Sequence, residues 1–203
     1  MKNKCKLFLA FLISGLVLTF SGSYITHCFS NDFTLVQASK LHKSYMRHPI
    51  SWRKSSETKP YPNLHKVKHL WIRVSLNKNR TYIMSGKHII YTMYSSGGVY
   101  KKINGKRQSL TPTGTYHIQP ERGTWFYNAG VGEGAHYYVS WKGNGVYLFH
   151  SVPTHQNGKY IVSNADKLGK DVASHGCIHL SIADSKWLYE NVPVGTKVII
   201  KQD

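Results

Sequence analysis

Acidic residues and cysteines are both scarce in this sequence of 203 residues, and each scarcity narrows the class of protein. Only 9 Asp and Glu stand against 27 Lys and Arg, which gives a formal net charge of +18. A chain this basic is attracted to polyanions, but charge alone does not choose among nucleic acid, anionic lipid and anionic wall polymer. The sequence also contains no CxxC or HExxH pattern, no internal repeat and no nucleic-acid-binding motif.

The N-terminal residues have the pattern of a secretory signal. Three lysines within the first six residues precede an uncharged apolar run over residues 7–20. Val36-Gln37-Ala38 offers a cleavage site, whereas extension of the run to Ile25 gives about the ~20 residues that span a bilayer. We therefore predict that residues 1–38 are a signal peptide or an N-terminal membrane anchor. The protein is expected to be exported, to the extracellular space or the cell wall.

Export changes the meaning of the cysteines and of the charge. Cys5 and Cys28 lie in the targeting segment, so the exported part contains Cys177 alone and a disulfide scaffold is excluded. A lone thiol can be an inert buried group, but the neighbours of Cys177 indicate chemistry. Outside the cell, an anionic wall polymer or membrane surface is the expected polyanionic partner, and nucleic acid is not expected.

The remainder of the chain divides into a linker and one domain. Residues 39–65 contain six Lys or Arg and three Pro but a single Glu, without periodicity, which predicts a flexible basic linker. Residues 66–203 are expected to form one mostly β domain, because short runs rich in Ile, Val, Tyr and Trp are separated by turn-like segments. Strands are expected at 69–76, 81–84, 88–94, 116–119, 135–141, 146–151 and 196–201, with turns at 77–79 and 85–87.

One helix is predicted in this domain. Ser181 followed by Asp184 is similar to a capping box, and Pro193 ends the helical pattern, so the helix should cover about residues 182–191. The predicted architecture is a β-sandwich-like domain with this helix packed on the sheets.

Two segments contain the residues that can do chemistry, one around Cys177 and one around His150. A free thiol has a pKa of about 8.5 and is mostly protonated at neutral pH, but a nearby imidazole can take its proton. His150, at the end of an apolar strand, is the candidate base. Gly176 permits a tight turn that would aim backbone N–H groups at the point where an oxyanion forms, while His175 fixes the loop or lines the site. This combination predicts a Cys–His acyl-transfer site.

Zinc is the competing explanation of the same residues. Cys177 and three histidines are all competent ligands. However, His175 and Cys177 would be cramped around a single glycine, and the usual ligand gap is met only loosely by His175 and His179. The spacing favours the acyl-transfer site, and neither a metal nor an organic cofactor is expected.

The segment Ser174-His175-Gly176-Cys177, preceded by His150-Ser151-Val152-Pro153, resembles the signature of the L,D-transpeptidase catalytic domain of the YkuD type. Thr111-Pro112-Thr113-Gly114-Thr115-Tyr116 is similar to a strand start of that family, and Ser95-Ser96-Gly97-Gly98 occupies the place of its serine–glycine segment. The resemblance covers roughly residues 67–202.

This resemblance implies a cysteine acyltransferase of peptidoglycan biosynthesis, with roles in cell-wall organisation and cell shape. Such an enzyme attacks the peptide stem after its third residue, a diamino acid, and releases the terminal D-alanine. The thioester then passes to an amine of a neighbouring stem and gives a 3-3 crosslink. The implied partners are peptidoglycan stem peptides, and the protein is expected to be a monomer.

The resemblance also assigns roles to individual residues. Cys177 would be the nucleophile and His150 the general base and acid, with the Ser151 carbonyl orienting the imidazole. The amides of Gly176 and Cys177 would contribute to the oxyanion hole, and His175 would line the site. Ser174 and His179 are the expected substrate contacts.

Two departures from the family pattern affect the surroundings of the site. His179 occupies a position that is commonly Arg or Asn, so contact with a substrate carboxylate or anchoring of the loop should differ. The 23 residues between His150 and Ser174 form a longer insertion than in compact members, and residues 156–171 are predicted to form a lid over the substrate groove.

Three functions remain open at this point. The first is a transpeptidase, and the second is an L,D-carboxypeptidase that uses water in place of the acceptor amine. The third is a non-catalytic basic protein that binds the wall. An intact Cys177–His150 pair argues against the third, but the sequence does not separate the first two or identify the diamino acid.

Overall fold

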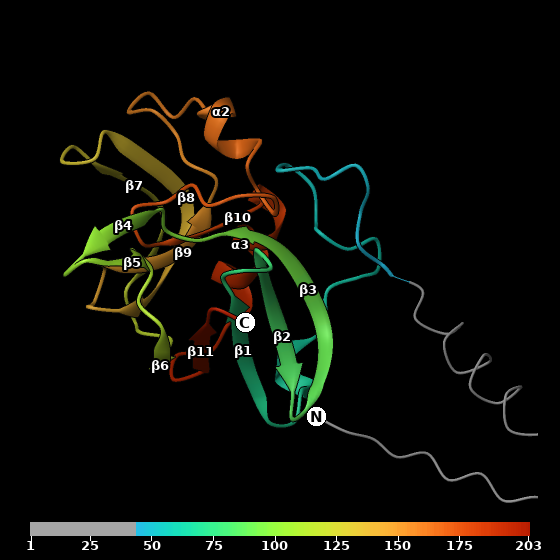
Figure 1. Cartoon of the computed structure of the whole chain (residues 1–203). Helices are drawn as coiled ribbons and strands as arrows, with labels where there is room; N and C mark the ends of the chain where they lie inside the picture. Colours follow the sequence, from blue (N-terminus) through green and yellow to red (C-terminus); the bar gives the residue numbers. More distant parts are fainter. Residues whose placement is uncertain (1–43) are drawn as a thin grey trace, which may run out of the picture. The chain divides into compact units, whose positions relative to one another are not determined.

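Strands dominate the part of the chain that the structure describes, as the sequence predicts. The computed structural model describes residues 44–203 (Figure 1), so the predicted signal or anchor over 1–38 lies outside the described residues. No helix within 44–203 is long and apolar enough to cross a membrane. The strands are β1 (Leu70–Ser75), β2 (Arg80–Ser85), β3 (His88–Ser96), β4 (Tyr100–Ile103), β5 (Lys106–Ser109), β6 (Gly114–His117), β7 (Arg122–Asn128), β8 (Glu133–Lys142), β9 (Tyr147–Ser151), β10 (Ile178–Leu180) and β11 (Lys197–Lys201). The helical elements are η2 (Leu64–Lys66), α2 (Val162–Ala165) and α3 (Ile182–Asn191).

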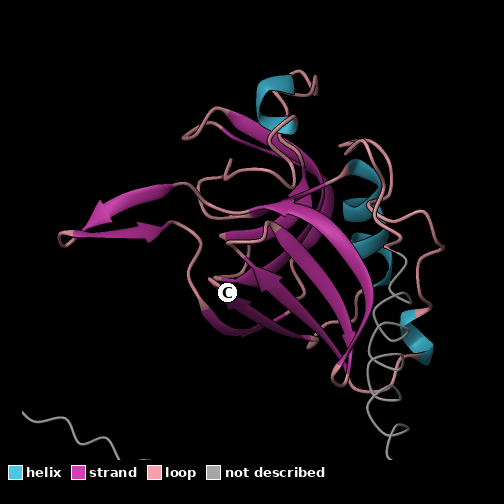
Figure 2. Cartoon of the chain, turned by 45° about the vertical axis from the view of Figure 1, so that its right-hand side comes forward, coloured by secondary structure: helices cyan, strands magenta, loops and turns pink. Residues whose placement is uncertain are grey.

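Nine of these strands form one sheet in the order β6-β11-β1-β2-β3-β10-β9-β8-β7. The pairs β1–β11 and β9–β10 are parallel, and the other neighbours are antiparallel. The sheet curls until the chain beyond β6 meets β8, where Gln119 N–H donates to the Ser140 carbonyl at 2.8 Å. The short β4–β5 hairpin forms a separate two-stranded ribbon that extends away from the curled sheet (Figure 2).

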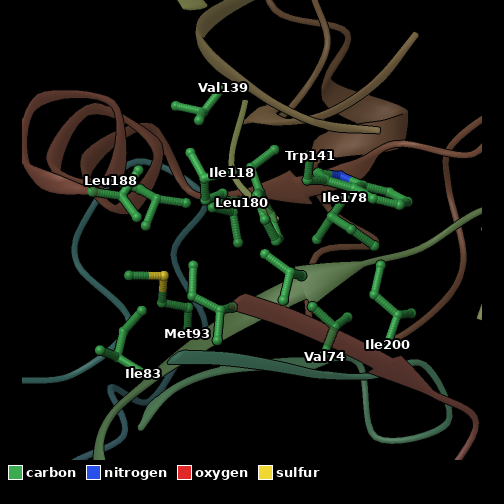
Figure 3. Close-up of a cluster of buried hydrophobic side chains, with 14 of the residues drawn as sticks. Val74, Ile83, Met93, Ile118, Val139, Trp141, Ile178, Leu180, Leu188 and Ile200 are labelled. Carbon is green, nitrogen blue, oxygen red and sulfur yellow. The ribbon is translucent and has the colours of Figure 1, made fainter. Parts of the chain in front are cut away.

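The inside of the curl is the hydrophobic core (Figure 3). Ile178 and Leu180 of β10 are fully buried there, beside Ile83, Met93 and side chains from both arms of the sheet. Burial of a large apolar side chain stabilises the fold by roughly 1.5–3 kcal/mol. Successive strand residues point to opposite faces of a sheet. Because Ile178 and Leu180 point into the core, Cys177 and His179 point to the face away from it.

The predicted helix has the predicted bounds. Helix α3 covers Ile182–Asn191, and the Ser181 side chain accepts a hydrogen bond from the Asp184 amide at 3.1 Å. Its Leu188 is fully buried in the core, against strands β8 and β9. The turns expected at 77–79 and 85–87 are also present, where Asn79 and Gly86 have φ of 52° and 56°.

The prediction of a flexible linker over 39–65 is wrong for residues 44–65. Ser56 is buried, and its hydroxyl donates to Asp184 Oδ2 at 2.5 Å and accepts the Tyr94 amide at 2.8 Å. The Glu57 carboxylate accepts the Thr92 amide of β3 at 2.8 Å, on the part of the β3 edge that extends beyond its short pairing with β10. We call residues 44–65 the strap. The strap covers this part of the β3 edge, where its side chains accept the hydrogen bonds that a neighbouring strand would otherwise accept.

Aromatic packing also holds the strap against the domain. Tyr61 stacks on Trp187 of α3 with ring centroids 4.8 Å apart, and its hydroxyl donates to Asp184 Oδ1 at 2.7 Å. The composition of the strap is that of a linker, but its anchors are three or four isolated side chains. A few anchoring residues have little effect on the average composition of a segment. The linker prediction relied on composition and therefore missed them.

Candidate active site

A pocket of about 580 Å³ lies on the face of the sheet opposite the core. Its chemistry-bearing lining residues are Glu133, His150, Ser174, His175, Cys177 and His179. The tip of the β7–β8 hairpin, residues 128–131, and the turn at Gly145–Val146 form much of the remaining wall.

Strand register explains why Cys177 and His150 meet in this pocket. In the parallel pair β9–β10, His179 is the partner of His150 and Ile178 the partner of Phe149. Ile178 and Phe149 point into the core, so the alternate residues Cys177, His179, Leu148 and His150 point into the pocket.

The loop that presents Cys177 is closed by Ser174. The Ser174 hydroxyl donates to the Cys177 carbonyl at 2.5 Å and accepts the Gly176 amide at 3.0 Å. Gly176 has φ of +136°, and a Cβ at this position would lie 2.9 Å from the Tyr147 ring and 3.0 Å from the Leu110 carbonyl. Only glycine fits such a turn.

These bonds change two of the sequence predictions. The Gly176 amide already donates to Ser174 and is therefore not free for the predicted oxyanion hole. Ser174 is 1% exposed, and its single donor proton is used within the loop, so it shapes the loop instead of contacting a substrate by donation. Among the described residues, none accepts a hydrogen bond from the Cys177 amide, which stays free to serve an oxyanion.

Two further segments of the sequence signature converge on the same loop. Thr111 is buried, and its hydroxyl donates to the Gly176 carbonyl and accepts the Gly98 amide, both at 2.8 Å. The Gly97 carbonyl accepts the amides of Ala173 and Ser174 at 3.0 and 3.1 Å. A Cβ on Gly98 would lie 2.7 Å from the Thr111 amide nitrogen, so glycine is required for this close approach. The signature residues distant from Cys177 thus support the loop that carries it.

His150 is held in one orientation by its neighbour. Its Nδ1 lies 2.6 Å from the backbone carbonyl of Ser151, the contact that the resemblance implies. A carbonyl is only an acceptor, so Nδ1 carries the proton and Nε2 keeps a free lone pair. The Phe126 ring packs edge-on against the imidazole, with centroids 5.5 Å apart. His150 is therefore fixed as a neutral base.

Burial disfavours charge on both central groups. It lowers the pKa of His150 to about 4, although the hydrogen bond to Ser151 acts in the opposite direction. It also raises the pKa of Cys177 to about 11, a rise to which the Glu133 carboxylate adds. At neutral pH the free site therefore holds a thiol and a neutral imidazole in one pocket, not the thiolate–imidazolium pair of many cysteine enzymes.

His179 and His175 occupy different environments. His179 is 2% exposed, its ring centroid lies 4.8 Å from that of His150, and its Nδ1 has no hydrogen-bond partner among the described residues. Burial and the two neighbouring histidines lower its pKa well below the ordinary value, so it is neutral. His175 is largely exposed at the pocket rim, with Nδ1 3.6 Å from Glu133 Oε2.

Glu133 was not among the residues singled out from the sequence. It begins β8, far from both signature segments, and nothing in its local sequence distinguishes it from a surface carboxylate. The strand order places β8 beside β9, and this brings Glu133 to the pocket.

The predicted lid is wrong. Residues 156–171 do not line the pocket; they form α2 and pack Ala165 and Leu168 into a second apolar cluster with Trp52 of the strap. The Arg80 guanidinium secures this segment through the Gly169 carbonyl at 2.9 Å. The insertion is glycine-containing and polar, like a lid, but its two buried apolar side chains hold it against the domain.

The four candidate zinc ligands do not assemble into a metal site. Within residues 44–203, no three His, Cys, Asp or Glu side chains gather closely enough to hold a metal ion. The arrangement can instead perform acyl transfer, since it combines a thiol, an oriented neutral base and a free amide around one pocket.

Comparisons with known proteins agree with this chemistry. Residues 69–200 match the family described as the L,D-transpeptidase catalytic domain (YkuD). Over 151 residues the chain is 48% identical to YciB of Bacillus subtilis (strain 168), provisionally designated an L,D-transpeptidase, and the match covers 74% of each chain.

Solved structures show a looser similarity. An L,D-transpeptidase from Mycobacterium smegmatis is 19% identical with a TM-score of 0.49, over 66% of this chain and 58% of that one. An L,D-transpeptidase from Xylanimonas cellulosilytica is 17% identical with a TM-score of 0.47, over 70% and 65%. The present chain thus spans less than two thirds of either solved chain.

Proposed function

Because the chain belongs to the L,D-transpeptidase catalytic domain family, we propose that it is a peptidoglycan L,D-transpeptidase with Cys177 as its nucleophile. The observation that carries this proposal is the fixed tautomer of His150. The Ser151 carbonyl holds Nδ1–H, and the free Nε2 belongs to an imidazole that lines the same pocket as Cys177.

The first half-reaction forms a thioester. As the Cys177 sulfur attacks the carbonyl after the third stem residue, its proton passes to His150 Nε2. The Cys177 amide stabilises the oxyanion that forms. His150 then returns the proton to the amine of the departing D-alanine, and the C–N bond breaks.

The neutral resting state determines the timing of proton transfer. A thiol with a raised pKa beside an imidazole with a lowered pKa does not form an ion pair in advance. The proton therefore moves together with sulfur attack, when bound substrate has displaced water and negative charge is developing on the carbonyl oxygen. Because no thiolate is present before the substrate binds, side reactions of a thiolate are suppressed.

The second half-reaction consumes the thioester. An amine of a neighbouring stem attacks the carbonyl, the C–S bond breaks, and the sulfur regains a proton through His150. The product is a 3-3 crosslink and a free thiol. We also propose that residues 1–38 direct export to the cell wall, where the surplus of 27 Lys and Arg over 9 Asp and Glu favours anionic wall polymer or the membrane surface.

Product analysis of the purified protein with tetrapeptide stem fragments tests this function. Mass spectrometry should detect crosslinked dimer and released D-alanine, and Cys177→Ala should abolish both. His150→Ala should reduce turnover almost as far. Tripeptide without dimer would indicate the carboxypeptidase, and absence of any reaction would indicate a non-catalytic wall-binding protein.

A further inference from the structure

The lining of the pocket differs in charge from the rest of the protein. The chain has three times as many basic as acidic residues, yet none of the described residues that line the pocket is a lysine or an arginine. Glu133 is the single carboxylate in that lining. A lining with one carboxylate and no Lys or Arg favours a positively charged group on the ligand over a negatively charged one.

Glu133 has one oxygen engaged and one open. Its Oε1 accepts the Asn164 side-chain amide at 2.9 Å. Its Oε2 lies 3.6 Å from His175 Nδ1, which is too long for a hydrogen bond. The side chain is 19% exposed, so Oε2 is accessible to a donor that enters the pocket.

The orientation of this carboxylate is set before any ligand arrives. Asn164 belongs to α2, which the apolar anchors Ala165 and Leu168 hold against the domain. Glu133 itself starts β8, where it is paired in register with Asn128 of β7. A carboxylate fixed at one oxygen and open at the other forms a preorganised hydrogen-bond acceptor for a cation.

We propose that Glu133 binds the ammonium group of the acceptor stem and presents that amine to the Cys177 thioester. This inference rests on the proposed function and names the residue that would favour an amine acceptor over water. The donor stem offers a carbonyl to Cys177, whereas the acceptor must offer a nitrogen that is cationic in solution. The Glu133 carboxylate attracts the cationic nitrogen of the acceptor stem, whereas it has no attraction for the carbonyl of the donor stem.

The proton balance of this step is simple. The ammonium loses one proton to water and becomes the neutral amine. The amine nitrogen attacks the thioester carbonyl, a C–N bond forms and the C–S bond breaks. The second N–H proton passes through His150 to the departing Cys177 sulfur. Glu133 remains a carboxylate throughout, so it is a specificity residue and not the catalytic base.

Glu133→Gln is the informative change, because the amide oxygen can still accept the hydrogen bond from Asn164 while the charge is lost. Glu190→Gln is the matched control, since Glu190 is half-exposed on α3, is not among the residues that line the pocket, and pairs with Lys186 at 3.9 Å. In the full-length protein, three rates are measured with a tetrapeptide donor: D-alanine release, dimer formation against acceptor-stem concentration, and thioester cleavage by hydroxylamine. Hydroxylamine is uncharged at neutral pH and does not need a carboxylate.

We expect Glu133→Gln to raise the KM for the acceptor stem by roughly tenfold or more, as loss of a charge-assisted hydrogen bond would. Tripeptide should accumulate in place of dimer, while hydroxylamine cleavage and D-alanine release stay within about threefold of wild type, the spread expected of a conservative change. Glu190→Gln should match the wild type in all three rates.

Two results would overturn the inference. An unchanged acceptor KM would show that Glu133 does not bind the amine. An equal fall in all three rates would show that it only supports the structure. If the wild-type protein itself releases no D-alanine and forms no thioester, the proposed function fails, and this outcome is visible without any variant.

Discussion

Thr111 offers a sharp test of how the site is built, because it joins two distant segments to the loop of Cys177. Its buried hydroxyl bridges the Gly98 amide and the Gly176 carbonyl at 2.8 Å each. Thr111→Val keeps the shape of the side chain but removes both bonds. The two backbone groups are then left unpaired in the interior, at a cost of about 1–3 kcal/mol each. The free energy of unfolding should therefore fall by about 2–6 kcal/mol.

Activity should fall as well, because the Gly176 carbonyl is next to Cys177, the proposed nucleophile. A displacement of about 1 Å at a reacting group can reduce a rate by roughly 100-fold. We expect the rate of D-alanine release by Thr111→Val to fall at least tenfold under conditions where the variant is still folded.

Thr111→Ser is the matched control. It keeps the bridging oxygen and removes one methyl group, a loss of about 0.8 kcal/mol. Urea unfolding followed by tryptophan fluorescence gives the stability of each variant, and D-alanine release gives the activity. If Thr111→Val is no less stable than Thr111→Ser, or retains full activity, the bridge does not support the site as described.

Three more predictions concern the resting state and the strap. Alkylation of Cys177 by iodoacetamide should accelerate with pH up to about 10 and remain slow at pH 7, because burial raises the pKa of the thiol to about 11; a plateau of the rate near neutrality would reveal a standing ion pair. The folded-state pKa of His150, about 4, is below that of the unfolded chain, so its contribution to stability is present above pH ~6.5 and lost as the pH falls toward ~4. Urea unfolding should show about 3 kcal/mol of this dependence in the wild type, and His150→Gln should lack that part; equal pH dependence in both would refute the assignment. Ser56→Ala should lower the free energy of unfolding by about 2–3 kcal/mol through loss of its bond to Asp184, whereas a truly flexible linker would tolerate the change without a measurable effect.

The sequence was sufficient to predict those features that depend on neighbouring residues. Alternation of apolar and polar residues located most strands, and the Ser181 cap and Pro193 located α3 to the residue. The apolar strand around Phe149 and the glycine turn at 176 likewise pointed to His150 and Cys177, which the structure brings to one pocket. In each case the deciding interactions lie within a few residues of one another.

Among the missed features, the strap and the place of Glu133 depend on contacts between distant segments, whereas the hydrogen bond from Gly176 to Ser174 is a local one. The strap was read as a linker because single residues such as Ser56 find their partners across more than a hundred positions. The Gly176 amide was assigned to the oxyanion because a sequence does not show that Ser174 would turn back to accept it. Glu133 joins the Cys177 pocket because β8, β9 and β10 are neighbours, and the β9–β10 pairing joins segments distant in sequence. Composition and periodicity contain no signal for such pairings.

The central claim is that Cys177 forms the acyl-enzyme, and intact-protein mass spectrometry tests it most directly. The protein is mixed with a tetrapeptide donor in the absence of an acceptor and quenched in acid. We predict a mass increase equal to one tripeptide acyl group, located on Cys177 by peptide mapping and accompanied by one equivalent of D-alanine, with no adduct in Cys177→Ala. Release of D-alanine by Cys177→Ala, or turnover of wild type with the acyl group on another residue, would contradict the account.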